Sequence, residues 1–270
     1  MATSTLTTLP TELLEEIIPH SLPEGFEGLA LTCRELYNLC TPWIERHNQR
    51  CKMFREFTYN KYPNNGLLSV HNPPAVNLIQ DIAHDPVVAR YIRHADFTYD
   101  TWPPKARPVQ LFYFISLIGL LPDPDLGGPV AALLAESPYL RAAGLDWREY
   151  YALIQEDLES RSRYSQHAAA FLLTLLPNVT SLKLPCLWQP CEMADKLIHA
   201  IIRRAVNRPS LSSSLWDRPS LAQVTEFEPY RESGPPGHVF SFDLADAVSF
   251  LALPRLRSFR ARDCVARDGA

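Results

Sequence analysis

Side chains that could bind a metal ion or carry out acid–base chemistry are scattered in this sequence. Four of them, near the N-terminus, could supply ligands to a metal: His20, Cys33, Cys40 and His47. Their spacing matches no structural zinc pattern, and the two cysteines fall on an apolar helical stripe. None of the six cysteines forms a Cys-x-x-Cys pair. The sequence therefore predicts no metal site, and most of the cysteines are expected to be small core residues in a reducing compartment.

Carboxylates and histidines give no stronger indication of catalysis. Asp123 and Asp125, in "LPDPDLGGP", could be paired carboxylates or part of an anion-binding loop, but the flanking Pro and Gly favour a plain turn. His94 lies on a strand-like segment, where a structural role is more common. The motifs GxSxG, HExxH, GxxxxGK[ST] and GxGxxG are all missing. We expect no enzyme, no catalytic residue and no cofactor; an enzyme of unrecognised class built on residues 76–270 is an alternative.

Composition limits the class of protein. The chain has 270 residues, enough for one large domain or for a small module with a larger one, and its 46% hydrophobic and 21% charged content excludes wholesale disorder. Residues 1–50 hold three Arg and seven Glu, whereas the other 220 residues balance at 23 basic and 23 acidic. No part is basic enough to indicate a nucleic-acid partner.

Targeting signals are weak as well. The N-terminus lacks the basic region and uninterrupted apolar core of a signal peptide. The longest apolar run, residues 111–121, is too short to span a bilayer. We therefore expect no membrane partner and a location in the cytoplasm, the nucleus or both.

The elements that would position a site begin with "LPTELLEEIIPHSLPEGFEGLALTCRELYNLC", residues 9–40. A first helix is predicted to start near Pro10 and to stop at Pro19, with Leu9, Leu13 and Ile17 at a spacing of four. A second helical stripe follows over residues 26–40, Pro42 is expected to end it, and a third helix begins there. We place a helical module at residues 7–58 and a turn-rich connection at 59–75.

Residues 76–270 are predicted to alternate between helices and short strands. Strands are expected within 91–100 and 178–185, and residues 207–238 are expected to be a long surface excursion rich in Pro, Ser and Gly. The helices are predicted at about 76–90, 109–121, 146–159, 166–176, 192–206 and 244–254. The fold class is therefore mainly α with a small β component.

A similarity inside the chain suggests how the strands associate. "FLLTLLPNVTSLKLP" (171–185) and "SFLALPRLRSFRAR" (249–262) share an apolar helix end, Leu-Pro, a turn residue and an alternating strand, and "ARYIRHADF" (89–97) follows the plan more loosely. The plan predicts an irregular, leucine-rich-repeat-like stack in which each strand joins a small parallel sheet. Coincidental Leu-Pro boundaries in an ordinary α/β domain are the alternative.

The opening segment resembles an F-box, a short helical motif headed by Leu-Pro-x-Glu-Leu-Leu-x-x-Ile. Leu9, Pro10, Glu12, Leu13, Leu14 and Ile17 occupy the matching positions, Leu22 matches the leucine that closes the first half, and residues 33–37 match the second half. The sequence of residues 9–40 is similar to that of filamentous-fungal F-box proteins. Pro19 and about one extra residue before Leu22 depart from the pattern, at the expected end of the first helix.

The resemblance implies a substrate-receptor subunit of an SCF-type (Skp–cullin–F-box) ubiquitin ligase. Such a protein binds the Skp adaptor, and through it a cullin, and presents a protein substrate whose identity the sequence does not give. The apolar face expected on the N-terminal module agrees with this function, because so small a module has too little core to bury that face. The expected adaptor contacts are Leu9, Pro10, Leu13, Ile17, Leu22, Phe26 and Leu29. A non-catalytic scaffold that binds the adaptor outside a ligase, or an ordinary helical hairpin, is the alternative.

The C-terminal region is expected to hold the substrate surface, at residues 92–98, 179–185 and 256–262. The sequence stops soon after a strand-like segment, so we expect a shorter chain than typical relatives and an open end of the stack over residues 255–270.

Overall fold

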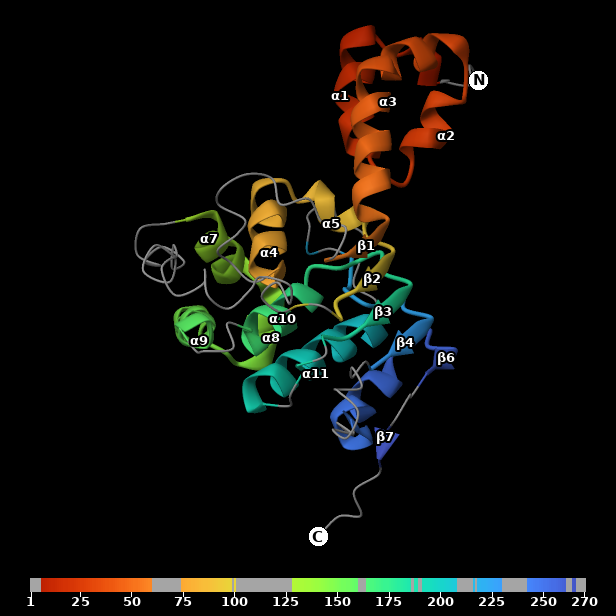
Figure 1. The fold of residues 1–270 in the computed structure, drawn as a ribbon. Helices are drawn as coiled ribbons and strands as arrows, with labels where there is room; N and C mark the ends of the chain where they lie inside the picture. The colour runs from red at the N-terminus through yellow and green to blue at the C-terminus, as the bar shows by residue number, and fades with distance from the viewer. Residues whose placement is uncertain are drawn as a thin grey trace, which may run out of the picture. The chain divides into compact units, whose positions relative to one another are not determined.

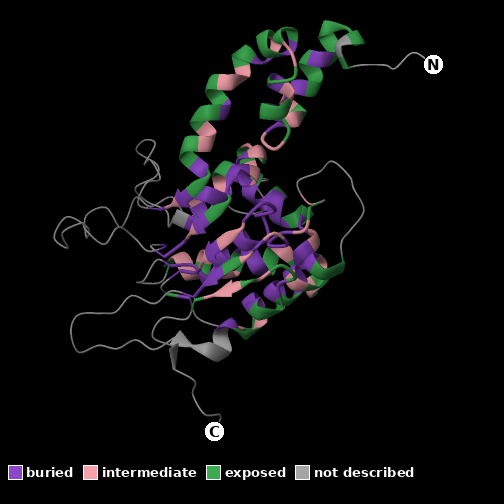
Figure 2. Ribbon diagram, turned by 90° about the vertical axis from the view of Figure 1, so that its right-hand side faces the viewer, coloured by how far each residue is buried: buried purple, intermediate pink, exposed green. Residues whose placement is uncertain are grey.

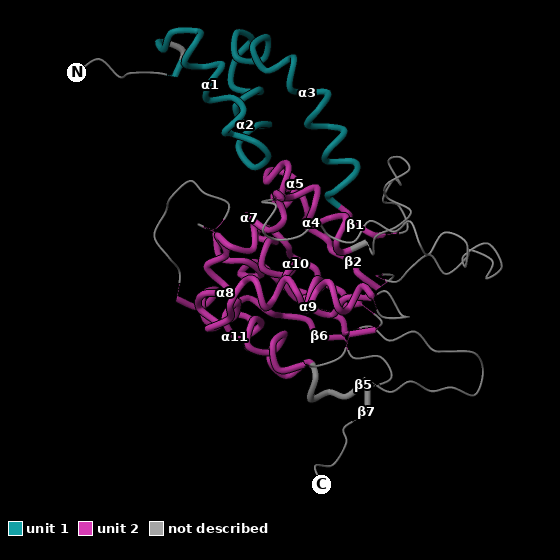
Figure 3. The backbone as a smooth tube through the Cα atoms, turned by 90° about the vertical axis from the view of Figure 1, so that its left-hand side faces the viewer, with its two compact units in different colours: residues 1–55 teal, residues 56–270 magenta. Residues whose placement is uncertain are grey.

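The chain folds into two compact units, residues 1–55 and residues 56–270 (Figure 3). The computed structural model describes residues 6–59, 74–98, 100, 128–159, 164–185, 187–188, 191–207, 216, 218–229, 242–260 and 264–265. The protein is mainly helical with a small parallel sheet, as the sequence predicts. The boundary lies earlier than the predicted 58, because residues 56–58 form a strand of the second unit.

Unit 1 is built from a 3₁₀ turn, η1 (Leu6–Thr8), and three helices, α1 (Thr11–Ser21), α2 (Phe26–Ala30) and α3 (Arg34–Phe54). Pro19 lies inside α1 and does not stop it, since a proline this close to the C-terminus removes only one hydrogen bond of the last turn. The predicted 26–40 stripe is broken between α2 and α3, where Cys33 adopts an extended conformation before α3.

Pro42 does not end a helix either, because α3 runs through it for 21 residues. An interior proline costs roughly 3 kcal/mol, so packing along the helix must outweigh that loss. Leu36 and Cys40 before the proline and His47 and Phe54 after it are all buried on one side. The apolar stripe that crosses the proline therefore determines the length of α3.

The three helices of unit 1 contact one another around a small core (Figure 2). α1 contributes Leu14 and Ile18, at i and i+4, and both are buried. The remaining buried apolar residues are Leu22, Phe26, Ala30, Leu36, Cys40 and Phe54.

Unit 2 contains a five-stranded sheet in which every neighbouring pair is parallel. Its order is β1 (Glu56–Thr58), β2 (His94–Asp96), β3 (Ser181–Lys183), β4 (Glu226–Glu228) and β6 (Ser258–Phe259). The strands are in register, with Phe57, Ala95, Leu182, Phe227 and Phe259 aligned across the sheet. A second, two-stranded sheet pairs β5 (Phe242–Asp243) with β7 (Cys264–Val265).

The two faces of the five-stranded sheet differ. The central residues of the first four strands are buried, and in Figure 1 the helices of unit 2 lie on one side of the strands. The residues before and after them point to the other face, where His94 and Glu226 are exposed and Lys183 is about one-third exposed. Only one face of this sheet therefore belongs to the core.

A row of backbone carbonyls connects successive strands at their start. The Arg93 carbonyl accepts from the amides of Thr180 and Ser181, the Thr180 carbonyl from those of Thr225 and Glu226, and the Thr225 carbonyl from those of Arg257 and Ser258. The hydroxyls of Thr180 and Thr225 each donate to the carbonyl of the preceding strand, at 3.1 Å. The repeated pattern sets one register for the stack.

The helices of unit 2 stack in the same order as the strands. They are α4 (Pro74–His84), α5 (Val87–Tyr91), α7 (Pro129–Glu136), α8 (Pro138–Ala143), α9 (Trp147–Glu159), α10 (Gln166–Leu173), α11 (Glu192–Asn207) and the 3₁₀ helix η4 (Leu244–Ala252). α4 contacts α10, α10 contacts α11, and α11 contacts η4, while α7, α8 and α9 pack against this row. Within the described residues no helix is long and apolar enough to cross a membrane.

Local signals explain where several of these helices begin and end. The Ser137 and Ser165 hydroxyls accept the amides of Leu140 and Ala168 at the starts of α8 and α10, and an Asp146 carboxylate oxygen accepts two amides at the start of α9. Gly144 ends α8 with a φ of 69°. The predicted 76–90 helix is two helices, α4 and α5, separated at Pro86.

The prediction for residues 207–238 is also wrong. The proposed surface excursion contains β4, an interior strand between β3 and β6, and the buried Leu221, Val224 and Phe227. The Pro and Ser residues on both sides of β4 indicated a loop, although "VTEF" at β4 repeats the pattern of "VTSL" at β3. The predicted 109–121 helix, Asp123 and Asp125 lie outside the described residues.

Candidate functional site

The predicted adaptor face forms an exposed apolar row on unit 1. The exposed fractions of Leu9, Leu13 and Ile17 are 37%, 45% and 37%. Pro10 directly precedes α1, is itself exposed, and its carbonyl accepts the amides of Leu13 and Leu14. The row therefore runs along the start and the outer side of α1, and is named here the α1 outer row (Leu9, Pro10, Leu13, Ile17).

The apolar arc of α1 is divided between two uses. Successive residues of a helix are turned by about 100°, so Leu14 and Ile18 face the core while Leu13 and Ile17 do not. The inner pair is 3% and 1% exposed. A surface helix of a small module needs one apolar side to fold. The α1 outer row is a second apolar side, which the module does not need in order to fold.

The structure corrects part of the predicted contact set. Leu22 is 3% exposed and Phe26 is 2% exposed, so both lie in the core of unit 1, away from solvent. The Phe26 ring packs 4.8 Å from that of buried His47. Leu29 is half-buried. In this conformation Leu22 and Phe26 support the fold of the module, and a partner would contact the α1 outer row instead.

Other exposed side chains of unit 1 define the surroundings of this row. Glu12, Glu15 and Glu16 are exposed on α1, so the row lies among acidic side chains. Further exposed large apolar residues of unit 1 are Leu6, Leu31, Tyr37 and Met53. The exposed surface of α1 therefore combines apolar side chains with negative charge at their edge.

A second cluster in unit 1 brings together Glu27, His47 and Cys51. His47 Nε2 lies 3.5 Å from a Glu27 carboxylate oxygen and 3.4 Å from Cys51 Sγ, and the three potential ligand atoms lie within 4.8 Å of one another. From the sequence, His47 was a possible ligand together with Cys33, Cys40 and His20 instead. Oxygen, nitrogen and sulfur are ligands that zinc accepts, but the carboxylate is 72% exposed and its contact with the ring is long.

The outer face of the sheet in unit 2 carries charges of both signs. Lys183 Nζ lies 3.6 Å from carboxylate oxygens of Asp96 and of Glu228, and Arg260 lies 3.9 Å from Glu226. These residues come from four neighbouring strands or their ends. Their positions overlap all three predicted substrate segments, and Glu226 and Glu228 come from β4, which the prediction omitted.

Sequence reasoning missed one further cluster, Asp157, His167 and Cys191. These residues come from α9, α10 and the residue before α11. No local motif links them, because their spacings of ten and 24 residues depend on how the three helices pack. Only the presence of Cys, His and Asp somewhere in the chain could have suggested the combination.

Comparison with protein-family models, curated proteins and solved structures finds no match for this chain. The resemblance of residues 9–40 to an F-box thus stays a prediction. Any functional proposal depends on the geometry of the two units.

Proposed function

We propose that this protein is a substrate receptor of an SCF-type ubiquitin ligase, in which unit 1 binds a Skp adaptor and unit 2 presents a protein substrate. The observation that carries the proposal is the α1 outer row, an apolar row left exposed on a module whose core is already filled by other residues. The F-box resemblance of the same segment supplies the identity of the partner.

The energetics of the row suit a stable interface. Fully burying a Leu or Ile side chain gains about 1.5–3 kcal/mol, and these side chains are already partly covered on the free protein. Three of them with Pro10 give the kind of apolar centre that protein–protein interfaces bury. The acidic side chains of α1 would lie at the rim, where they affect association rate and partner choice.

Unit 2 supplies a second surface. The face of its parallel sheet opposite the helices carries Lys183 and Asp96, which are each about one-third exposed, and the buried Glu228 pairs with Lys183 there. A polar sheet face of this kind can bind a protein segment without taking part in chemistry. Transfer of ubiquitin would belong to other subunits of the ligase.

The direct test is binding of the purified full chain to a Skp adaptor. Leu13→Asp with Ile17→Asp should weaken binding by at least about 100-fold, because ~3 kcal/mol of apolar contact is lost and two carboxylates would be buried. Met53→Asp is a matched control, since Met53 is as exposed as Ile17 but lies near the end of α3.

Both variants should remain helical by circular dichroism, because the replaced side chains are exposed. Undiminished binding by the folded double variant would refute the assignment of the row. Failure of the adaptor-bound chain to bind a cullin that is then added would support a scaffold that acts outside a ligase.

A further inference from the structure

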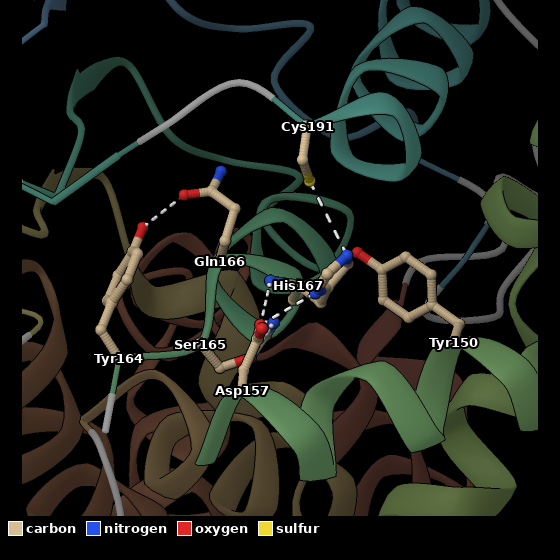
Figure 4. A network of polar contacts seen from close by, with 8 residues as sticks. Tyr150, Asp157, Tyr164, Ser165, Gln166, His167 and Cys191 are labelled. Atoms are coloured by element: carbon tan, nitrogen blue, oxygen red, sulfur yellow. Dashed lines mark hydrogen bonds and ion pairs between the residues drawn. The ribbon is translucent and has the colours of Figure 1, made fainter. Parts of the chain in front are cut away.

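A half-buried thiol in unit 2 lies at one end of a short chain of hydrogen bonds. Cys191 Sγ is 3.7 Å from His167 Nε2, and His167 Nδ1 is 2.8 Å from an oxygen of Asp157 (Figure 4). The imidazole therefore lies between a thiol and a carboxylate, with one ring nitrogen facing each. This order of groups can hold a thiolate and an imidazolium together.

The Asp157 carboxylate accepts more hydrogen bonds than a single ion pair would give it. The same Asp157 oxygen accepts the Ser165 hydroxyl at 2.9 Å, the His167 backbone amide at 3.2 Å and the His167 ring. Burial raises the pKa of Asp157, but these hydrogen bonds and the nearby imidazole outweigh it and hold the pKa below the usual range. The negative charge is thus present at neutral pH and holds the ring nitrogen Nδ1 in its protonated form.

The imidazole is held in place from the side as well. The Tyr150 hydroxyl donates to the His167 carbonyl at 2.9 Å, and the two rings meet edge to face at 5.5 Å. Burial lowers the pKa of His167, but the hydrogen bonds to Asp157 and Cys191 and the charges of both groups raise it to about 9. The ring therefore retains its second proton across the physiological range.

The start of α11 also favours a negative charge on sulfur. The Cys191 carbonyl accepts the Asp195 amide at 2.9 Å, so the thiol belongs to the residue that opens a 16-residue helix. The charged and titratable groups around it are Tyr150 and Asp157 of α9, His167 of α10, and Glu192 and Asp195 of the first turn of α11. Glu192 is exposed and lies 2.7 Å from Lys196. Of these groups, the imidazolium is the cation in hydrogen-bond contact with the sulfur.

We propose that Cys191 is a reactive thiolate that small hydroperoxides oxidise to a sulfenic acid, with His167 as the proton donor and Asp157 as its positioning residue. The proposal is independent of adaptor binding, since it involves no residue of unit 1. A small reagent is favoured because the side chains of Asp157 and His167 are only 25% and 12% exposed and Cys191 itself is half-buried.

The reaction balances with groups already present. The Cys191 thiolate attacks the terminal oxygen of the hydroperoxide, so an S–O bond forms while the O–O bond breaks. Sulfur gives up two electrons, and the leaving hydroxide or alkoxide takes the Nε2 proton of His167 to give water or an alcohol. Two equivalents of a small thiol then reduce the sulfenic acid, through a mixed disulfide, back to the thiol.

The first test is the pH dependence of alkylation by iodoacetamide, followed for each cysteine by mass spectrometry of the full chain. A thiol paired with an imidazolium supplies more of the reactive thiolate at pH 6.5 than an ordinary thiol, which is almost fully protonated there. Cys191 should therefore be alkylated about five-fold faster than Cys51 at pH 6.5.

The chain contains its own reference thiols. Cys51 is also half-buried beside a histidine, and Cys40 is fully buried, which raises its pKa. His167→Gln should slow the alkylation of Cys191 at pH 6.5 to the rate of Cys51 or below and leave the rate at Cys51 unchanged. Asp157→Asn should slow the alkylation of Cys191 by a smaller amount. His47→Gln, the matched variant in unit 1, should leave Cys191 unaffected.

The second test is trapping of the sulfenic acid with dimedone after hydrogen peroxide is added. Label should appear at Cys191 before Cys51, disappear after thiol treatment, and be lost from Cys191→Ser. The wild-type pH profile needs no variant, so the proposal stays testable even if His167→Gln does not fold. Alkylation of Cys191 at pH 6.5 no faster than that of Cys51, or peroxide labelling no faster than at Cys51, would overturn it.

Discussion

Units 1 and 2 each place a cysteine, a histidine and a carboxylate together, but they arrange the three groups differently. In unit 1, Glu27 and Cys51 both contact the same nitrogen of His47, at 3.5 and 3.4 Å. In unit 2, Asp157 and Cys191 contact opposite nitrogens of His167. Only the second arrangement allows a doubly protonated ring to serve two anions at once.

The same contrast holds for burial. The Glu27 carboxylate of unit 1 is 72% exposed, and Leu9, Leu13 and Ile17 of the same unit lie outside its core. In unit 2 the Asp157 carboxylate is only 25% exposed, and α7, α8 and α9 pack against the helices that cover the sheet. A module of 55 residues has too little interior to enclose every group. Its unused surface is therefore the place to expect a partner.

The largest effect should come from the two sides of α1. Leu14→Ala with Ile18→Ala should unfold unit 1, because each buried truncation costs about 2–5 kcal/mol. Leu13→Ala with Ile17→Ala removes the same atoms from exposed positions and should cost less than about 1 kcal/mol. Hydrogen exchange over residues 11–54 measures both. Equal loss of protection would mean that the outer row is covered in solution.

A smaller effect on stability is expected from replacing the carboxylates of the two clusters, Asp157 in unit 2 and Glu27 in unit 1. Asp157→Asn should lower the free energy of unfolding of unit 2 by about 2–3 kcal/mol, since one partly buried oxygen accepts three hydrogen bonds. Glu27→Gln should change that of unit 1 by no more than about 0.5 kcal/mol, because Glu27 is exposed. Chemical denaturation of the full chain gives both values, and a larger effect at Glu27 would reverse the comparison.

The pKa of His167 should respond to its two partners separately. In Cys191→Ser the ring loses a hydrogen bond and a negative charge, so its pKa should fall below about 9 but stay above 6.5, because Asp157 remains. The folded pKa is still raised in this variant. The associated stability is therefore complete below pH 6.5 and lost as the pH rises through the folded pKa. NMR titration of the ring protons checks this, and a pKa at or below 6.5 would contradict the role of Asp157.

The smallest effect is expected on the outer face of the sheet. Lys183→Met should cost less than about 1 kcal/mol despite two carboxylates at 3.6 Å, because Lys183 is 37% exposed and water screens the charges. The loss should shrink further at high salt. Thermal unfolding at two salt concentrations is sufficient. A cost well above 1 kcal/mol at high salt would show that the ion pairs are shielded from water.

Helical periodicity predicted much of the fold because it depends on neighbours in the sequence. The two predicted helices on either side of Pro42 cover the single helix α3, and "FLLTLLPNVTSLKLP" predicted α10 followed by β3. Proline was the main source of error, since Pro19 and Pro42 both lie within helices. β4 was missed because three residues between Pro- and Ser-rich stretches carry too little pattern.

The candidate sites were predictable only to the extent that they are local. Leu9, Leu13 and Ile17 belong to one helix and its start, so their spacing was sufficient to place them together. The burial of Leu22 and Phe26 depends on tertiary packing, such as that of the Phe26 ring against His47 of α3, which no local pattern gives. The cluster of Asp157, His167 and Cys191 depends on three helices and gave no signal at all.

The constant register of the sheet has a consequence for how this protein can change during evolution. Ser181 follows His94 by 87 residues, Glu226 follows Ser181 by 45, and Ser258 follows Glu226 by 32, yet each pairs in the same way. Alignment is set by the carbonyls of Arg93, Thr180 and Thr225 and not by the length of chain between strands. Insertions and deletions outside the helices that lie between the strands therefore leave the pairing unchanged, and divergent descendants should differ most in those loop lengths while keeping the threonines.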